Sequence, residues 1–328
     1  MDLKTKNKKL TDRIQKARDC KRSSARVYSS NIGRIHREFL SKTTYNQNLK
    51  WLHDNSDSLL TKLKKVENLN TQRNLLAAAL VALDLTNGTK KRAAYVKQIG
   101  VLNKLKEQVA VKGEMTEKQA AKYIDWTKVV KLRRLLARSV RLARYYARKH
   151  INKSDFQLLQ QNLVLHLYTL MPPVRNDWST VRYLTESGWS GLSEQEKQTS
   201  NNLVMARGGY RIYWAEYKTK KKHGVIMQMI PKQLQTLLKK HIKMLKDRYD
   251  DNHLLWTQNG TPMTRNSLTK FLQRLFYKHF RKKISTSALR SIFLTHKFDK
   301  KVLEDARTIA RAMHHTPETA RDFYVKNK

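Results

Sequence analysis

The chain has little of several features that would narrow its class. Its 328 residues include a single cysteine, Cys20, so an internal disulfide and a cysteine-built zinc site are both excluded. No apolar run is long enough to span a bilayer, and no signal-peptide pattern opens the chain. We therefore expect an intracellular protein that is neither secreted nor inserted in a membrane.

Acidic residues are also scarce. The 26 Asp and Glu residues face 68 Lys and Arg residues, which gives a formal net charge of +42 and a pI near 10.4. A chain this basic is expected to associate with a polyanion. Nucleic acid is the leading candidate, because neutralising its phosphates releases counterions and drives binding. A basic protein that lies on a membrane surface is the alternative.

The apolar pattern divides the chain into three parts. Residues 1–22 are rich in lysine and arginine and predict a basic arm or frayed helix, which either follows a DNA backbone or is simply solvated. Residues 23–112 have helical periodicity and predict a small all-helical domain. A polar stretch over 109–117 interrupts this periodicity and is the expected linker to a second domain over 113–328.

Within the first domain, leucine spacing predicts one helix over 49–63. The apolar run over 75–83 predicts a buried helix, which Asn87-Gly88 ends, and the spacing over 93–105 predicts a third helix.

A corner in the second domain carries the first candidate site residue. A helix over 156–170 is apolar on most faces and runs into Met171-Pro172-Pro173. Two prolines force a break, so Arg175 is expected at a rigid turn directly after a buried helix. An arginine beside a proline turn is by itself an ordinary surface charge.

A predicted hairpin carries the second candidate. After a polar insertion near residues 187–202, aromatic and β-branched residues alternate over 210–217 and again over 225–230. The lysine-rich connection between them contains Lys218 and Lys220, either of which is a candidate site residue. A lysine-rich tip that is merely solvated is the alternative. Pro231 then opens a helix that extends to about residue 245.

The last candidates lie near the end of the sequence. Arg290 is on a predicted helix, and apolar residues recur at helical spacing over 302–313. Thr316 is a good N-cap with Pro317 at the first helical position, so a new helix is expected to begin there and to carry Tyr324. His315 directly precedes this cap.

The order and spacing of Arg290, His315 and Tyr324 resemble the C-terminal signature of the tyrosine recombinases, the phage-integrase superfamily. Arg175 matches the first catalytic arginine of that family. Ser287 is a departure, because the family usually has histidine three residues before this second arginine. The segment 117–126 resembles the catalytic-domain entry of recombinases from large eukaryotic DNA viruses, virophages and related mobile elements.

The resemblance implies a fold that is mainly α with a small antiparallel β-sheet. Residues 23–112 would be the core-binding domain and residues 113–328 the catalytic domain, with DNA clamped between them. It also implies strand cleavage and rejoining, in which Tyr324 attacks a DNA phosphorus and forms a 3′-phosphotyrosyl link. The arginines and His315 would stabilise the charge of the transition state, and Lys218, the match to the hairpin lysine of the family, would protonate the 5′-oxygen.

The implied function is that of a site-specific recombinase or integrase. It would need no metal or cofactor and would act on double-stranded DNA as a homotetramer, in the host nucleus or a viral factory. Further DNA contacts are expected from Lys220, Lys221, Lys222 and His296. Two alternatives are a type IB topoisomerase, which uses a similar residue set, and a non-catalytic DNA-binding protein with a decayed site, at which Ser287 hints.

Overall fold

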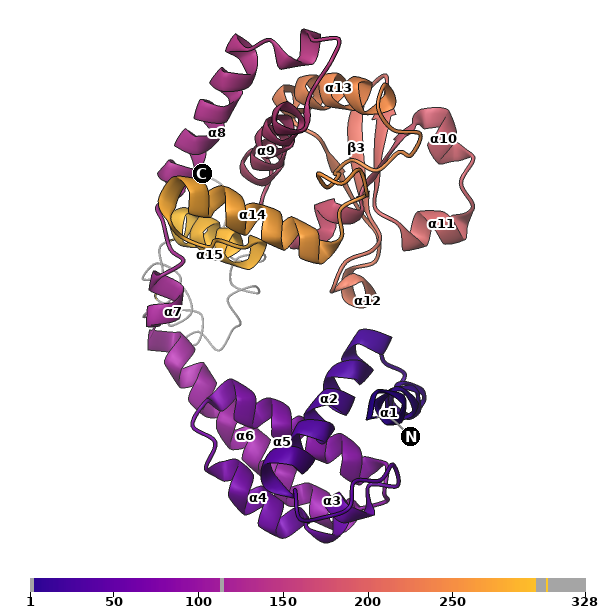
Figure 1. The fold of residues 1–328 in the computed structure, drawn as a ribbon, viewed down its shortest axis with the longest axis vertical. Coiled ribbons are helices and arrows are strands. Elements are labelled where there is room, and N and C mark those ends of the chain that lie inside the picture. Colours follow the sequence, from indigo (N-terminus) through magenta and orange to yellow (C-terminus); the bar gives the residue numbers. More distant parts are fainter. Residues whose placement is uncertain (1–2, 113–114, 299–304, 306–328) are drawn as a thin grey trace. The chain divides into compact units, whose positions relative to one another are not determined.

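The computed structural model describes residues 3–112, 115–298 and 305 (Figure 1). The described chain is mainly helical and contains one four-stranded sheet. It separates into two compact units, Met1–Glu114 and Met115–Lys328, two residues beyond the boundary that the sequence predicts. A separate hydrophobic core lies in each unit.

The first unit is all-helical, as the apolar periodicity predicts. Its second helix, α2, packs against α1 and α5, and α5 packs against α6. The predicted buried helix corresponds to α5, which is capped by the Asn68 side chain and is buried along most of its length. The elements of this unit are α1 (Leu3–Arg18), α2 (Arg22–Phe39), α3 (Lys50–Asp54), α4 (Ser56–Lys64), α5 (Leu69–Asp84) and α6 (Thr89–Lys112).

Two features of the first unit differ from expectation. The expected basic arm contains α1, whose Leu10 and Ile14 are completely buried in the core of the unit, so this helix is part of the domain. The single helix expected over 49–63 is two helices, α3 and α4. They separate at Asn55, whose side-chain amide donates a 2.8 Å hydrogen bond to the Trp51 carbonyl and so ends the first of them.

The second unit combines long helices with the sheet. Its elements are α7 (Glu117–Ala120), α8 (Trp126–Leu142), η1 (Tyr145–Ala147), α9 (Lys153–Leu170), η2 (Asn176–Thr180), β1 (Arg182–Thr185), α10 (Glu186–Ser190), α11 (Glu194–Thr199), β2 (Asn202–Ala206), β3 (Gly209–Trp214), α12 (Lys220–His223), β4 (Ile226–Met229), α13 (Lys232–Lys246), α14 (Arg265–Phe280) and α15 (Thr286–Lys297).

Three predictions for this unit are confirmed. The buried helix α9 ends at Leu170, directly before the Pro172-Pro173 break. Strands β3 and β4 pair antiparallel as the predicted hairpin, with the short helix α12 in their connection. The helix predicted to open at Pro231 is α13, and Pro231 is its N-cap residue.

The small sheet is mixed, so the expectation of an antiparallel sheet is wrong. The strand order is β1-β2-β3-β4, and β1 pairs parallel with β2. Parallel neighbours need a crossover connection, and the expected polar insertion over 187–202 supplies it as α10 and α11. This segment is therefore part of the sheet architecture.

The expected linker over 109–117 begins inside α6, which continues to Lys112. In the part of the chain that the structure describes, no helix is both long and apolar enough to cross a membrane. The predicted helix over 302–313, His315 and Tyr324 lie outside the described residues.

Candidate functional site

Arg175 lies at the corner between α9 and η2, where the sequence predicts it. It occupies the N-cap of η2, and its carbonyl oxygen accepts a 2.6 Å hydrogen bond from the hydroxyl of the buried Tyr168. Trp178 of η2 packs edge-on against Trp214 of β3, with 4.8 Å between the ring centroids. The backbone of Arg175 is thus fixed by the core while its side chain remains half-exposed.

A hydrogen-bonded bridge links this corner to α15. The Thr286 hydroxyl donates to Asn176 Oδ1 at 2.9 Å, and the Asn176 amide donates to the Thr269 hydroxyl of α14 at 2.9 Å. Thr286 is buried, in the first turn of α15, and Arg290 follows four residues later on the same helical face. The bridge therefore brings the Arg290 side of α15 to the Arg175 corner.

The electrostatics of the two arginines confirm that they are neighbours. Burial lowers the pKa of Arg290, the positive charge of Arg175 lowers it further, and Asp177 opposes both effects. An arginine stays protonated in proteins, so the lowered pKa records repulsion and lost hydration of a charge that persists. Among the described residues, neither guanidinium group has an ion-pair or hydrogen-bond partner. Both are available to an anion.

A third arginine, Arg265, has a structural role. It lies 3.4 Å from Asp177 Oδ1 and 3.3 Å from Glu216 Oε1, and it donates to the Glu216 carbonyl at 2.9 Å. Burial raises the pKa of Asp177, and the positive charges of Arg265, Arg175 and Arg290 lower it in part. Arg265 therefore joins the start of α14 to η2 and to the end of β3.

Asn201 anchors the hairpin to the same corner. This fully buried side chain donates to the Asp177 carbonyl at 3.3 Å and to the Glu216 carbonyl at 3.1 Å. Its Oδ1 accepts from the backbone amides of Ala215 and Glu216 at 2.9 and 2.8 Å. The backbone that leads from β3 to Lys218 is thus held against η2.

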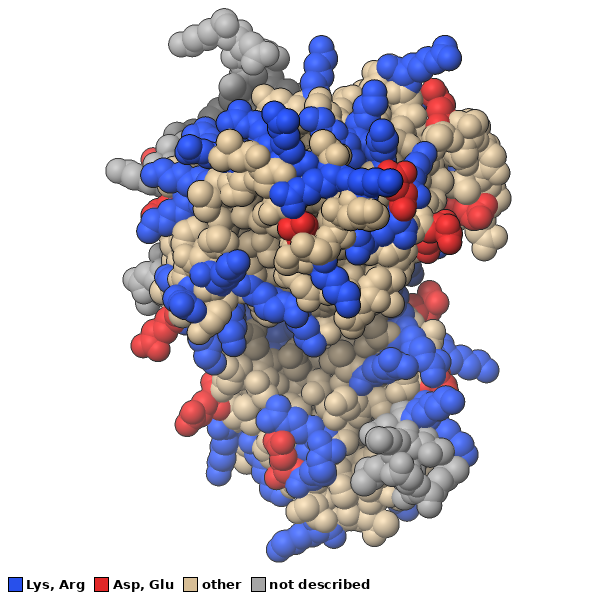
Figure 2. Space-filling view, turned by 45° about the horizontal axis from the view of Figure 1, so that its top comes forward, with Lys and Arg blue, Asp and Glu red and all other residues tan. Residues whose placement is uncertain are grey.

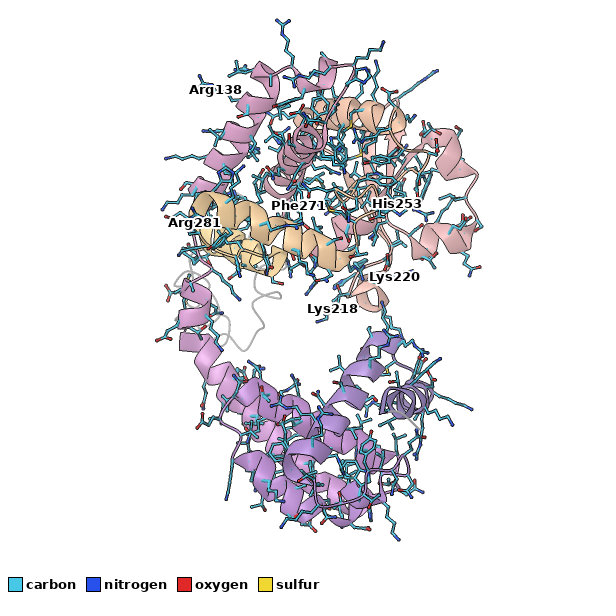
Figure 3. All side chains as sticks on the ribbon, in the orientation of Figure 1. Arg138, Lys218, Lys220, His253, Phe271 and Arg281 are labelled. Atoms are coloured by element: carbon cyan, nitrogen blue, oxygen red, sulfur yellow. The ribbon has the colours of Figure 1, made fainter. Side chains whose placement is uncertain are left out.

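The two candidate hairpin lysines differ in their surroundings. Lys218 is exposed in the turn before α12, and its side chain has no partner among the residues described (Figure 3). The ammonium group of Lys220 instead donates to the carbonyl oxygen of Gln198 in α11. Of these two ammonium groups, the Lys220 group is thus held by a neighbouring helix and the Lys218 group is not. Lys221 and Lys222 are exposed in α12 beside them.

The remaining described candidates lie on α15. Ser287 is exposed in the first turn, three residues before Arg290 and therefore on the same side of the helix. His296 is exposed near the other end, where its ring stacks on Trp126 of α8 at 6.5 Å between centroids. This contact shows that His296 packs against α8. His315 and Tyr324 lie outside the described residues, so the catalytic candidates that the structure describes are Arg175, Lys218, Ser287 and Arg290.

Sequence reasoning missed the residues that assemble this site. Asn176, Thr286, Asn201 and Arg265 are all polar residues that join segments far apart in the chain. Arg265 carried one usable signal: it is the first residue of α14, where a positive charge opposes the helix dipole and calls for an acidic partner.

Lys and Arg side chains are dense on the face of the second unit that Figure 2 shows. In the described chain, no group of His, Cys, Asp and Glu side chains is arranged to hold a metal ion. Two guanidinium groups without an ion-pair partner among the described residues are thus neighbours at this corner, and such groups are suited to binding an anion.

Comparison with known proteins adds no assignment. No protein-family model matches the chain, and the search of curated proteins found no match.

Proposed function

We propose that the chain cleaves and rejoins DNA strands by the tyrosine recombinase reaction. The observation that carries the proposal is the pairing of Arg175 and Arg290 through the Asn176–Thr286 hydrogen bond. These two arginines are 115 residues apart in the sequence, and both match arginine positions of the tyrosine recombinase signature. Two neighbouring guanidinium groups that lack a carboxylate partner are suited to the non-bridging oxygens of one phosphate.

The reaction assigns one role to each candidate residue. The phenolate oxygen of Tyr324, after losing its proton to solvent, attacks phosphorus and forms the O–P bond. The P–O5′ bond breaks, and Lys218 gives its proton to the departing 5′-oxygen. Arg175 and Arg290, with His315, stabilise the added negative charge on the phosphoryl oxygens. Attack by a 5′-hydroxyl on the phosphotyrosine reverses these steps and rejoins the strand.

The hairpin geometry supports the assignment of Lys218. Asn201 and Arg265 fix the end of β3 against η2, so the chain is anchored two residues before Lys218, at Glu216. A general acid needs an anchored backbone and a side chain that is free to reach the leaving oxygen. Lys218 meets both requirements, and Lys220, which is bonded to Gln198, does not.

Site-specific exchange between two DNA segments requires four active protomers, so we propose that the protein assembles as a homotetramer on double-stranded DNA. The other described candidates, Lys221, Lys222 and His296, would contact the DNA backbone outside the reacting phosphate.

The test is cleavage of a nicked DNA duplex that traps the covalent intermediate. Arg175→Ala and Arg290→Ala should each lower the cleavage rate by about 10²–10³-fold, since each removes a preorganised donor to the developing charge. Arg207→Gln is the matched control, because Arg207 is exposed in the β2–β3 turn at the opposite end of β3 from the hairpin connection. If all three variants cleave equally well, the paired arginines are not a catalytic site.

A further inference from the structure

A second basic site lies in the second unit, away from the paired arginines. A cavity of about 530 Å³ opens between α8, η1, α9 and α13. In Figure 1 these helices lie on the side of the second unit opposite α12. This volume is within the range of small-molecule sites, roughly 300–1,000 Å³. The strand-exchange chemistry proposed above makes no use of it.

One wall of the cavity is cationic. Arg133 and Arg141 from α8, Arg144 from the turn that follows, and Lys240 from α13 line it, together with Arg134. No carboxylate lines the cavity, and none of these cations has an ion-pair partner among the described residues. Burial lowers the pKa of Arg133, and the charge of Arg134 lowers it further. An anion bound here would relieve the repulsion among these groups.

The floor of the cavity is formed by α9 and carries two polar side chains, Asn162 and His166. Asn162 is 2% exposed, and its Oδ1 is buried without a partner. The Nδ1 of His166 lies 2.7 Å from the Asn162 carbonyl oxygen, to which it donates, so Nε2 is left as an acceptor. Burial lowers the pKa of His166 and keeps the ring neutral near pH 7. Asn162 Oδ1 lies below the surface that a ligand can reach, so the acceptor that the floor offers is His166 Nε2, which suits a ligand with an N–H donor.

The remaining lining is apolar. Val140 of α8, Leu170 of α9 and Leu237 of α13 complete the walls. The cavity thus combines a cationic wall, the His166 acceptor on its floor and apolar sides suited to a flat ring.

We propose that this cavity binds a nucleoside di- or triphosphate. The base lies between the apolar side chains and donates its amino group to His166 Nε2, and the phosphates lie on the arginines of α8. A DNA duplex is the competing polyanion. It presents its phosphates on a convex backbone that reaches the rim of the cavity and leaves the His166 acceptor without a donor.

The test is titration of the full chain with ATP by calorimetry, at physiological salt and without DNA. Arg133→Gln should weaken ATP binding at least about tenfold, because it removes a charge-assisted contact. Arg138→Gln is the matched control: it removes the same charge from the same helix, but Arg138 is exposed, is absent from the lining and points away from α9 (Figure 3). It should change binding less than about twofold. Tripolyphosphate should bind at least about tenfold more weakly than ATP.

Three results would overturn the proposal. The first is the absence of ATP binding at a one-to-one ratio. The second is an equal loss of affinity in Arg133→Gln and Arg138→Gln, which would indicate diffuse attraction to a basic surface. The third is equal affinity for tripolyphosphate and ATP, or displacement of ATP by a short duplex whose own binding depends on Arg133. Should Arg133→Gln fail to fold, Lys240→Gln with the exposed neighbour Lys239→Gln as its control makes the same comparison.

Discussion

The hydrogen bond from Thr286 to Asn176 offers a direct way to separate the two arginines without touching either. Thr286→Val keeps the branched shape of the side chain and removes the hydroxyl that donates to Asn176 Oδ1 at 2.9 Å. The Asn176 amide then remains tied to α14 through Thr269 alone. The prediction is that α15 loses its link to the Arg175 corner while both arginines remain in the chain.

The expected magnitude follows from the burial of this pair. Thr286 is buried and Asn176 is half-buried, so the lost bond leaves a carbonyl oxygen poorly hydrated. Such a loss costs about 1–3 kcal/mol of folding free energy. The cleavage rate should fall by about 10²-fold, which is more than the loss of folding free energy would cause in a folded sample. The reason is that a displacement of about 1 Å in a positioned group lowers the rate by this factor.

Two measurements check this prediction: the free energy of unfolding in urea, and the cleavage rate on a nicked duplex under conditions where the variant is fully folded. Thr286→Ser restores the hydroxyl and should recover most of the cleavage rate, which a general loss of packing would not predict. A Thr286→Val protein that is destabilised but cleaves at the original rate would refute the reasoning.

Two further predictions concern protonation. His241 is fully buried against the Tyr146 hydroxyl, and burial lowers its pKa to about 3, so the folded state excludes a proton that the unfolded state binds below about pH 6.5. Its contribution to stability is complete above pH 6.5 and is lost as the pH falls, by about 2 kcal/mol at pH 5. The free energy of unfolding, measured at pH 7.5 and pH 5, should show this loss in the unchanged protein and in the exposed-histidine control His150→Gln. A His241→Gln protein that shows the same loss would contradict this prediction. Lys218→Ala should cleave normal DNA slowly and a substrate with a bridging 5′-sulfur at nearly the original rate, since a thiolate leaves without a proton. Rescue of Lys220→Ala by sulfur, with Lys218→Ala behaving normally, would move the general acid to Lys220.

Much of the fold is predictable from local sequence signals. The Pro172-Pro173 break, the alternation in β3 and β4 and the N-cap at Pro231 each act within a few residues, and each predicted element is present. The parallel strand β1 was missed because it has only four residues and a single buried side chain, Tyr183, so its pattern does not rise above that of a loop.

Misreadings in the first unit have a similar cause. The lysines of α1 dominated the composition of residues 1–22, although Leu10 and Ile14 are four residues apart and lie on one helical face. Both residues are buried because α1 packs on the apolar face of α2, which carries Ile32 and Ile35. The charge of residues 1–22 gives no sign of this packing.

The candidate site was predictable as a set of residues, and its assembly was not. Local features predict the proline corner, the hairpin and the helix on which Arg175, Lys218 and Arg290 lie, and the resemblance to the tyrosine recombinase signature is what selects these three residues. The contacts that bring them together, through Asn176, Asn201 and Thr286, join positions up to 110 residues apart. Hydrogen bonds between single polar side chains at such separations leave no periodic signal in one sequence.

The central claim is that a tyrosine near the end of the sequence becomes covalently joined to DNA. The most direct measurement is mass spectrometry of peptides from protein incubated with a nicked duplex, which identifies the residue that carries the nucleotide. The account predicts a 3′-phosphotyrosyl nucleotide on Tyr324 and, in Tyr324→Phe, no adduct with nearly unchanged DNA affinity. Absence of any adduct from the unchanged protein, or an adduct that persists in Tyr324→Phe, would contradict it.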